Sequence, residues 1–452
     1  PRPLVLHGDR LYLQRHWVDE CIVAASLATR ASSSLTMAPE AVPIAPGAVA
    51  LLDELLPATH AEGAVNLQRT AGERVLGHRL ALIVGGPGTG KTYTVARLLA
   101  VLIADAQERG TELRIALAAP TGKAAARLQE AITASISDGG GTIPEPVRVA
   151  LGALVPTTIH RLLGPLPTRR HRFDHHATNQ LPHDVVVIDE TSMVSLPLLA
   201  RLVDALRPEA RFVLVGDPDQ LESVDLGAVL TDLVAAGTAS SSRLPGSVVR
   251  LARGHRFGAR SPIALLADSV REGREDEALA QLRAGASGDA EGGEVRFVET
   301  DDPLGAESMA AVEALVAPEL AALVDAARSG RVDDALAHLS RSRVLCAHRL
   351  GPHGVAMWNR QGERWLTGSA GPPPRWYVGR PLLITRNDPR LGLVNGDTGV
   401  VVVEKGRLVA VFRAAGGLVR WEPAQLEFAD TAYAMTVHKS QGSEYPAVAV
   451  VL

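Results

Sequence analysis

The sequence predicts an α/β fold with a parallel sheet that is covered by helices on both faces. Between about residues 61 and 240, short β-branched runs alternate with longer runs of helical periodicity, which is typical of such sheets. Polar residues follow these runs, at the edge where parallel sheets bind ligands. A glycine-rich segment also fits the phosphate-loop pattern G-x-x-x-x-G-K-S/T; it reads Gly85-Gly86-Pro87-Gly88-Thr89-Gly90-Lys91-Thr92.

The composition limits the classes of protein to consider. A length of 452 residues suggests two to four domains, and the net charge of −4 gives no global sign of nucleic-acid binding, so any DNA contact must come from a local channel. Two cysteines argue against a disulfide framework or a zinc site. We see no bilayer-spanning run and no signal peptide, and expect a cytoplasmic protein. The start at Pro1 and the end inside an apolar run suggest a fragment.

The predicted elements follow in order along the chain. Residues 1–60 have helical patterning, and strands are expected at 80–84, 114–118, 185–188, 212–215 and 344–347. The last of these opens a second α/β region. Between about 372 and 425, short apolar runs separated by turn residues predict a small inserted β-barrel. The acidic, glycine-rich stretch 272–294 is expected to be a solvated surface segment.

The phosphate loop lies between a predicted strand and the helical run 93–103. Its glycines allow backbone N–H groups to turn towards phosphate oxygens. We expect Lys91 to bridge the β- and γ-phosphates and the Thr92 hydroxyl to ligate magnesium. The strand before the loop and the helix after it make a chance match a poor alternative.

Two polar segments after later strands suggest hydrolytic chemistry. Asp189 is suited to hold the magnesium ion, and Glu190 to orient and deprotonate the water that attacks the γ-phosphate. Gln220 carries an amide suited to sense that phosphate, although an incidental glutamine in a Gly-Asp-Pro turn explains it equally well. An Asp-Glu pair alone is weak evidence, but about a hundred residues after a phosphate loop it is strong.

Together, the motifs resemble those of RecD-type superfamily 1 DNA helicases, and in particular the RecD subunits of RecBCD helicase–nucleases. The matching segments occur in family order at 85–92, 119–128, 158–164, 188–194, 214–224, 254–257 and 434–444. The resemblance implies an ATP-dependent 5′–3′ DNA helicase that uses ATP and Mg²⁺. It also implies a role in double-strand break repair and recombination, on single-stranded and duplex-end DNA, with RecB-like and RecC-like partner subunits.

The same resemblance implies two RecA-like P-loop motor domains with a small inserted SH3-like β-barrel and a short hairpin domain. We expect residues 1–60 to be the remnant of a partner-docking domain and linker. The first motor domain is expected at 61–240, with its hairpin at about 164–183. The second, truncated before the family's last arginine motif, is expected at 241–452, with the barrel at about 372–425.

The resemblance also assigns further site residues. Gln68 matches the adenine-reading glutamine, Arg256 the arginine that reaches the γ-phosphate, and Glu444 the carboxylate that holds the ribose. The residues that match DNA contacts are Thr121, Thr158, His160, Thr436, His438 and Lys439. Lys123 and Arg127 lie four residues apart and add to this track, or are ordinary solvated helix charges.

Three alternatives remain open. The histidines at 171, 175, 176 and 183 suggest a metal site, but their spacing is irregular and no cysteine supports them, so a DNA-guiding hairpin is the better interpretation. A RecD-like helicase that acts alone or is fused to a relaxase carries the same motifs; the segment 7–17, which resembles the end of a RecD N-terminal domain, favours the RecBCD subunit. A motor-dead scaffold is disfavoured by the intact catalytic residues.

Overall fold

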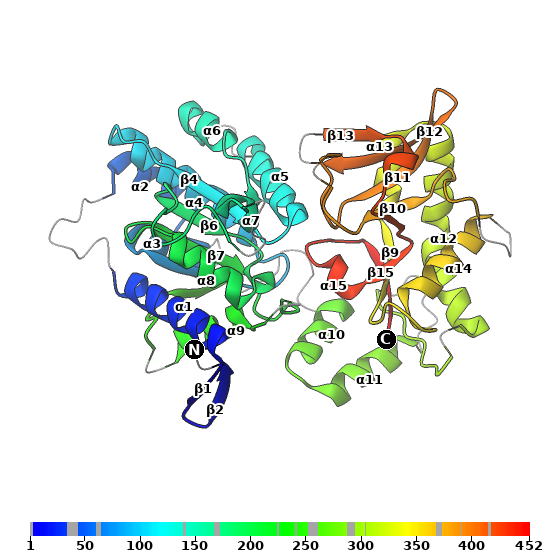
Figure 1. The fold of residues 1–452 in the computed structure, drawn as a ribbon, viewed down its shortest axis with the longest axis horizontal. Helices are drawn as coiled ribbons and strands as arrows, with labels where there is room; N and C mark the ends of the chain where they lie inside the picture. Colours follow the sequence, from blue (N-terminus) through cyan, green and yellow to red (C-terminus); the bar gives the residue numbers. More distant parts are fainter. Residues whose placement is uncertain are drawn as a thin grey trace. The chain divides into compact units, whose positions relative to one another are not determined.

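The computed structural model describes residues 3–33, 44–59, 65–138, 142–166, 172–223, 226–239, 242–251, 261–286, 294–302, 304–367, 373–388, 390–414 and 417–452. The chain divides into two compact units, Pro1–Ala264 and Leu265–Leu452 (Figure 1). Each unit has its own sheet and its own hydrophobic clusters.

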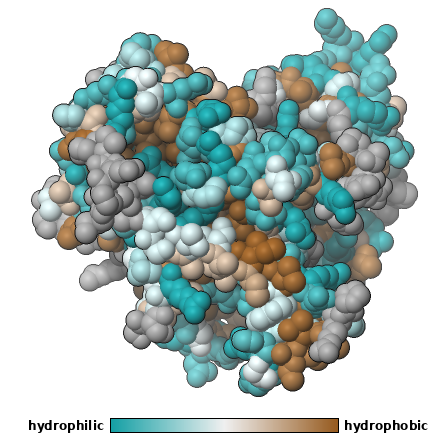
Figure 2. All heavy atoms as spheres, turned by 60° about the vertical axis from the view of Figure 1, so that its left-hand side comes forward, coloured by the Kyte–Doolittle hydropathy of each residue, from teal (hydrophilic) through white to brown (hydrophobic). Residues whose placement is uncertain are grey.

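Hydrophilic side chains cover much of the face drawn in Figure 2, and apolar residues form smaller patches between them. Across the described ranges, every helix is too short or too polar to cross a membrane.

The first unit contains a six-stranded parallel sheet with the order β5-β4-β6-β7-β3-β8. The expected α/β class with a parallel sheet is therefore confirmed. Two predicted strands match the structure residue for residue, and two others differ by one residue at each end. The strands are β3 (Leu80–Val84), β4 (Ile115–Ala119), β5 (Thr157–Thr158), β6 (Val185–Ile188), β7 (Arg211–Gly216) and β8 (Val248–Arg250).

Helices cover both faces of this sheet because alternate strand residues point to opposite sides. Ile83 and Val187 belong to a cluster with α2–α6, whereas Leu82 and Ile188 belong to a cluster with α1, α8 and α9. The helices are α1 (Gln14–Ser32), α2 (Pro46–Leu55), α3 (Leu67–Gly77), α4 (Lys91–Glu108), α5 (Gly122–Asp138), α6 (Glu145–Gly152), α7 (Ile159–Leu163), α8 (Leu196–Ala205) and α9 (Val229–Thr238).

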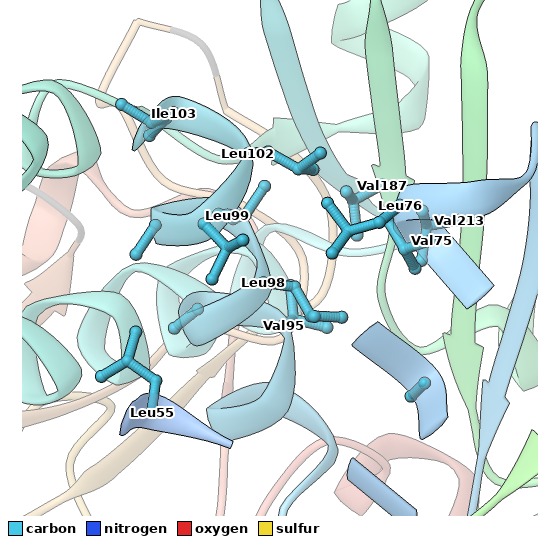
Figure 3. Close-up of a cluster of buried hydrophobic side chains, with 14 of the residues drawn as sticks. Leu55, Val75, Leu76, Val95, Leu98, Leu99, Leu102, Ile103, Val187 and Val213 are labelled. Atoms are coloured by element: carbon cyan, nitrogen blue, oxygen red, sulfur yellow. The ribbon is translucent and has the colours of Figure 1, made fainter. Parts of the chain in front are cut away.

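Helix α4 is the central helix of the first of these clusters. Figure 3 shows Val95, Leu98, Leu99 and Leu102 of this helix among side chains from α2, α3, β6 and β7. Each buried Leu or Val of this kind contributes about 1.5–3 kcal/mol relative to exposure. The phosphate loop is thus anchored by a strand on one side and by a helix in the core on the other.

Residues 3–13 differ from the expected helical pattern. β1 (Leu4–His7) and β2 (Arg10–Leu13) form an antiparallel hairpin before α1. Gly8 has a φ of 58° in the connecting turn, a conformation that glycine adopts without strain. The His7-Gly8-Asp9 turn outweighed the short helical pattern, so the helical prediction is wrong there.

The second unit has a three-stranded parallel sheet with the order β15-β9-β16. β9 (Ser342–Cys346) confirms the strand expected at 344–347, and it is fully buried between β15 (Ala434–Thr436) and β16 (Ala447–Val451). α12 (Ala306–Arg328) and α14 (Val355–Thr367) contribute to the cluster around Trp358. The remaining helices are α10 (Pro262–Arg271), α11 (Glu275–Ala286), α13 (Val332–Leu339) and α15 (Val437–Ser440).

The segment expected to form a barrel folds as a five-stranded antiparallel sheet with the order β13-β12-β11-β10-β14. Val400 and Val402 pack on α12 and α13, and Val401 and Phe412 form a separate cluster on the other face. Its closure into an SH3-like barrel stays a prediction. The strands are β10 (Pro381–Ile384), β11 (Thr398–Glu404), β12 (Arg407–Ala414), β13 (Gly417–Trp421) and β14 (Ala429–Thr431).

Candidate functional site

The phosphate loop connects β3 to α4 at the carboxyl edge of the sheet. Gly88 and Gly90 have φ values of 73° and 83°, which favour glycine. A Cβ on Gly85 would lie 2.8 Å from both the Leu251 carbonyl oxygen and Thr89 Oγ1. The loop therefore requires glycine at these three positions, for backbone conformation at two and for space at one.

Side chains of the loop also hold it closed. Lys91 Nζ donates to the carbonyl oxygens of Gly85 at 2.6 Å and Gly86 at 2.9 Å. Thr89 Oγ1 donates to the Gly86 carbonyl oxygen at 2.9 Å. The Lys91 ammonium group thus lies at the mouth of the loop, next to the N-terminus of α4, where anions bind well.

Gln68 lies beside the phosphate loop, and its role in binding adenine stays a prediction. A Cβ on Gly90 would be 2.6 Å from Gln68 Nε2, so the amide is packed against the loop backbone. Asn66 caps α3 by accepting hydrogen bonds from the backbone N–H groups of Gln68 and Arg69 at 3.0 and 3.4 Å. This cap fixes the first turn of α3 and thereby the position of Gln68.

Three carboxylates, those of Asp189, Glu190 and Asp217, follow the neighbouring strands β6 and β7, and the charges of Asp189 and Asp217 act on the pKa of Glu190. Asp189 and Asp217 are buried, and burial raises the pKa of each carboxyl group, whereas the nearby charge of Lys91 lowers it. The two strands are paired along their length, so their polar ends meet at one point. Buried acids beside a lysine form a site suited to a divalent cation and phosphate.

Glu190 has the strongest signs of a reactive group. Its backbone has a φ of 52°, and its buried Oε2 makes no hydrogen bond to any residue that the structure describes. Burial, with a further contribution from the charge of Asp189, raises the pKa of Glu190 to about 7. Such strain and orphaned oxygen are common at functional sites, and this pKa suits a general base.

Gln220 is held against Asp217. Its backbone N–H donates to the Asp217 carbonyl oxygen at 3.3 Å, and its Nε2 lies 3.4 Å from Asp217 Oδ2. Asp217 Oδ1 also accepts from the Asp219 N–H at 3.1 Å. The sequence analysis assigned no role to Asp217. The available signal in the sequence was that this polar residue directly follows the apolar end of β7.

Each threonine predicted to contact DNA is a helix cap. Thr121 Oγ1 accepts from the Ala124 N–H at 3.1 Å, Thr158 Oγ1 from the Arg161 N–H at 3.2 Å, and Thr436 Oγ1 from the Lys439 N–H at 3.3 Å. A hydroxyl that accepts from a helix N–H keeps its own hydrogen for another acceptor. A phosphate oxygen is one such acceptor, and the DNA role of these residues stays a prediction.

The other predicted DNA residues differ in exposure. His160 is exposed, and its ring packs edge-on against the ring of Phe173, with the two ring centroids 5.8 Å apart. Lys123 is partly buried on α5, and His438 is exposed on α15. Lys439 is half-buried, and burial, followed by the charge of Arg349, lowers its pKa.

The region expected to be a hairpin has antiparallel backbone bonds. The Asp174 N–H donates to the Gly164 carbonyl oxygen at 2.7 Å, and the Leu166 N–H to that of Arg172 at 3.2 Å. His171 lies outside the described residues. Within the ranges that the structure describes, no three His, Cys, Asp or Glu side chains gather as metal ligands would.

For two further predicted nucleotide residues, a role at this site stays a prediction. Arg256 lies outside the described residues. Glu444 is exposed on the segment before β16 in the second unit. The structure therefore brings together Gln68, Lys91, Asp189, Glu190 and Gln220, in the first unit, around one loop.

The site fits a nucleoside triphosphate with its metal ion. The loop has no room for side chains at Gly85 and Gly90 and presents a lysine and a helix N-terminus to the phosphates. The carboxylates of Asp189, Glu190 and Asp217 lie close enough to Lys91 for the charge of the lysine to act on each of them in the direction that lowers its pKa. A divalent cation would compensate the remaining negative charge.

Comparison with known proteins is consistent with this geometry. A model of an AAA domain matches residues 68–225. A RecBCD enzyme subunit RecD from Mycolicibacterium smegmatis is 46% identical over the whole chain and 74% of its own length. An ATP-dependent RecD2 DNA helicase from Deinococcus radiodurans is 31% identical, over 88% of this chain and 47% of its own. A Pif1 helicase structure from Bacteroides, with ADP-AlF3 and single-stranded DNA, is 15% identical, with a TM-score of 0.42 over 90% of this chain and 86% of its own.

The sheet, the phosphate loop and the relatives define the class as an ATP-dependent DNA helicase with a P-loop α/β domain. Subunits named RecD also include one from Mycobacterium tuberculosis, 44% identical over the whole chain and 73% of its own length. This chain belongs to the RecD family.

Proposed function

We propose that the chain is the 5′–3′ motor of a RecBCD-type helicase–nuclease. It acts in the cytoplasm on single-stranded and duplex-end DNA, with RecB-like and RecC-like subunits, in double-strand break repair and recombination. The observation that carries the proposal is that one edge of one sheet holds the phosphate loop, the acids and two predicted DNA threonines.

The proposed roles follow from side-chain chemistry and, for Gln68, Arg256 and Glu444, from the resemblance to RecD-type helicases. Lys91 binds the β- and γ-phosphates, and Thr92 and Asp189 hold Mg²⁺. Glu190 takes a proton from the attacking water, and Gln220 contacts the γ-phosphate and that water. Arg256 stabilises the charge that develops on the transferred group, and Gln68 and Glu444 bind adenine and ribose. Magnesium, when bound, neutralises phosphate charge.

One hydrogen bond and a short stretch of chain connect the proposed catalytic acids to Thr121 of the proposed DNA track. The Asp189 N–H donates to the Ala118 carbonyl oxygen at 2.9 Å, because β6 pairs with β4. Thr121 follows Ala118 by three residues and caps α5. We propose that a shift of the acids as the γ-phosphate leaves reaches Thr121 through this hydrogen bond and the segment that follows Ala118.

The finer architecture is part of the same proposal. Residues 61–240 and 241–452 form two RecA-like motors, the segment at about 164–183 is a DNA-guiding hairpin, and the antiparallel sheet within about 372–425 is an SH3-like barrel. The two faces of that sheet each pack a separate apolar cluster, which favours a curved sheet with its own core. Residues 1–60 belong to the partner-docking domain and linker.

A stand-alone or relaxase-fused helicase is the second candidate. The 31% identity to a RecD2 helicase gives it a specific basis, but 46% identity to a RecD subunit favours the complex. A motor-dead scaffold is disfavoured because Lys91, Glu190 and Gln220 are present and lie around one loop.

Co-purification with RecB-like and RecC-like chains from the same source, followed by ATPase assays with and without single-stranded DNA, tests the proposal. We expect a stable heterotrimer, DNA-stimulated hydrolysis, and unwinding by the RecD-type chain of substrates with a 5′ overhang in preference to a 3′ overhang. A chain that stays monomeric in their presence and unwinds DNA alone contradicts the subunit assignment. A chain without DNA-stimulated hydrolysis contradicts the motor assignment.

A further inference from the structure

The core of the second unit contains a buried arginine. Arg343 lies on β9, is 3% exposed, and forms no ion pair with any carboxylate that the structure describes. Its guanidinium is surrounded by backbone carbonyl oxygens and an aromatic ring. Burying a charge costs free energy that an apolar side chain of similar size does not, so core packing alone does not account for an arginine at this position.

The contacts of Arg343 lie on both sides of one motif segment, residues 434–444. One terminal nitrogen donates to the carbonyl oxygen of Ala432, two residues before this segment, and the other donates to that of Leu339 at 2.7 Å. The guanidinium carbon lies 5.2 Å from the ring centroid of Tyr445, which directly follows the segment. A single buried side chain therefore contacts the chain where it enters the segment and where it leaves it.

The two ends of the segment also contact each other. The Tyr445 hydroxyl lies 3.7 Å from Met435 Sδ. β15, which contains Met435, pairs in parallel with one edge of β9, and β16 pairs with the other edge (Figure 1). Between the ends, the chain forms α15 and a turn in which the Ser443 N–H donates to the Ser440 carbonyl oxygen at 2.7 Å. Arg343 thus lies on the central strand, between the strand that enters the segment and the strand that follows it.

We propose that Arg343 is a positioning residue: it holds both ends of segment 434–444 and thereby fixes Thr436 and Glu444 where they contact their ligands. The inference rests on the proposed function for the identity of those ligands, single-stranded DNA and the ribose of ATP. Glu444 is exposed, so its position depends on the neighbouring Tyr445, which contacts Arg343. The proposal adds a residue that lies outside every motif segment of the sequence.

Hydrogen–deuterium exchange of the full-length chain tests whether the segment is held in this way. Arg343→Met removes the guanidinium and keeps a side chain that fills the core, and Tyr445→Leu removes the ring from a less buried position. Each variant should raise the exchange rate of peptides that cover 434–445 about tenfold, while strands β10–β13 exchange as in the parent. The matched control is Arg341→Met, which removes an exposed arginine 3.7 Å from Glu319.

Nucleotide discrimination supplies a readout that a purely structural role would not change. If Glu444 binds a ribose hydroxyl, the parent chain should bind ATP about tenfold more tightly than the matching deoxy analogue, 2′-deoxyATP or 3′-deoxyATP. Glu444→Ala, Arg343→Met and Tyr445→Leu should each reduce this ratio of affinities towards one. A loss of folded protein lowers the binding of both nucleotides equally and leaves the ratio unchanged.

The outcomes separate this proposal from the proposed function. Unchanged exchange at 434–445, an equal rise throughout the second unit, or an equal rise in Arg341→Met overturns the positioning role. The same conclusion follows if Glu444→Ala abolishes the discrimination and Arg343→Met keeps it. If exchange rises as expected but Glu444→Ala discriminates between the nucleotides just as the parent does, the positioning stands and the proposed role of Glu444 in nucleotide binding fails.

Discussion

Thr121 allows the cap of a helix to be separated from a contact to DNA. Its hydroxyl oxygen accepts from the Ala124 N–H at 3.1 Å, and its hydroxyl hydrogen is left for a phosphate. Thr121→Ala removes both interactions, Thr121→Ser keeps both, and Thr121→Asp keeps a good cap while removing the donor and adding a negative charge.

The substitutions are expected to change folding stability and DNA affinity by different amounts. Loss of the cap in Thr121→Ala costs about 1 kcal/mol of folding free energy, or about 2–4 °C in the melting temperature of a unit of this size. Thr121→Asp should melt near the parent. For DNA, loss of one neutral hydrogen bond of about 1 kcal/mol weakens binding about fivefold. The aspartate should weaken it further, because its charge faces a phosphate.

Thermal unfolding and fluorescence anisotropy with a labelled oligothymidylate measure both effects on the same samples. Thr121→Ala combined with Thr436→Ala should weaken binding tenfold or more with little change in salt slope, because no charge is removed. If Thr121→Asp binds DNA as well as the parent, the hydroxyl does not face a phosphate and the residue is only a cap.

Lys91→Ala should abolish DNA-stimulated ATP hydrolysis while circular dichroism stays that of the parent, since the lost ammonium group contacts the loop carbonyl oxygens and, in the proposed function, the phosphates, but not the core; near-normal turnover would refute its role. Glu190→Gln should keep nucleotide affinity and lose hydrolysis, because the amide takes no proton; affinity that falls together with turnover contradicts the base. Burial raises the pKa of Asp184, but hydrogen bonds from the Arg114 N–H and from Arg207 outweigh it, and the net pKa is lowered. Its stabilising effect is therefore present above the ordinary carboxyl value of 3.8 and is lost as the pH falls through the lowered pKa. Asp184→Asn should melt earlier than the parent at pH 7, and the difference should shrink below pH 3.8; a difference that is constant with pH would show that the charge has no part in it.

The parallel sheet and the phosphate loop were predictable because their signals are local. Residues 80–84 and 185–188 are continuous apolar runs, and the structure places strands at the same positions. The backbone conformation of the phosphate loop requires glycines, and these glycines are visible directly in the sequence. Thr121 and Thr436 were found by their motifs, but their capping bonds depend on where each helix begins, which varies by one or two residues in any prediction.

Features formed by distant segments were not predictable in the same way. Arg349 lies in the loop after β9 and Arg380 lies directly before β10, with α14 between them in the sequence, and only the fold places them on one groove. The hairpin β1–β2 was missed because four-residue strands carry little periodic signal. Asp217 has the same pattern as many polar strand ends, and only its burial distinguishes it.

The hydrogen bonds of Lys91 to its own loop affect how tightly a nucleotide is held. Its ammonium group already has two acceptors, the carbonyl oxygens of Gly85 and Gly86. An entering triphosphate therefore exchanges partners with the loop, and the net gain is smaller than a new charge-assisted contact would give. When the diphosphate leaves, Lys91 returns to the loop carbonyl oxygens. Its ammonium group is therefore not left without hydrogen-bond partners. A motor that must empty its site once per step benefits from a lysine whose alternative partners are always within reach.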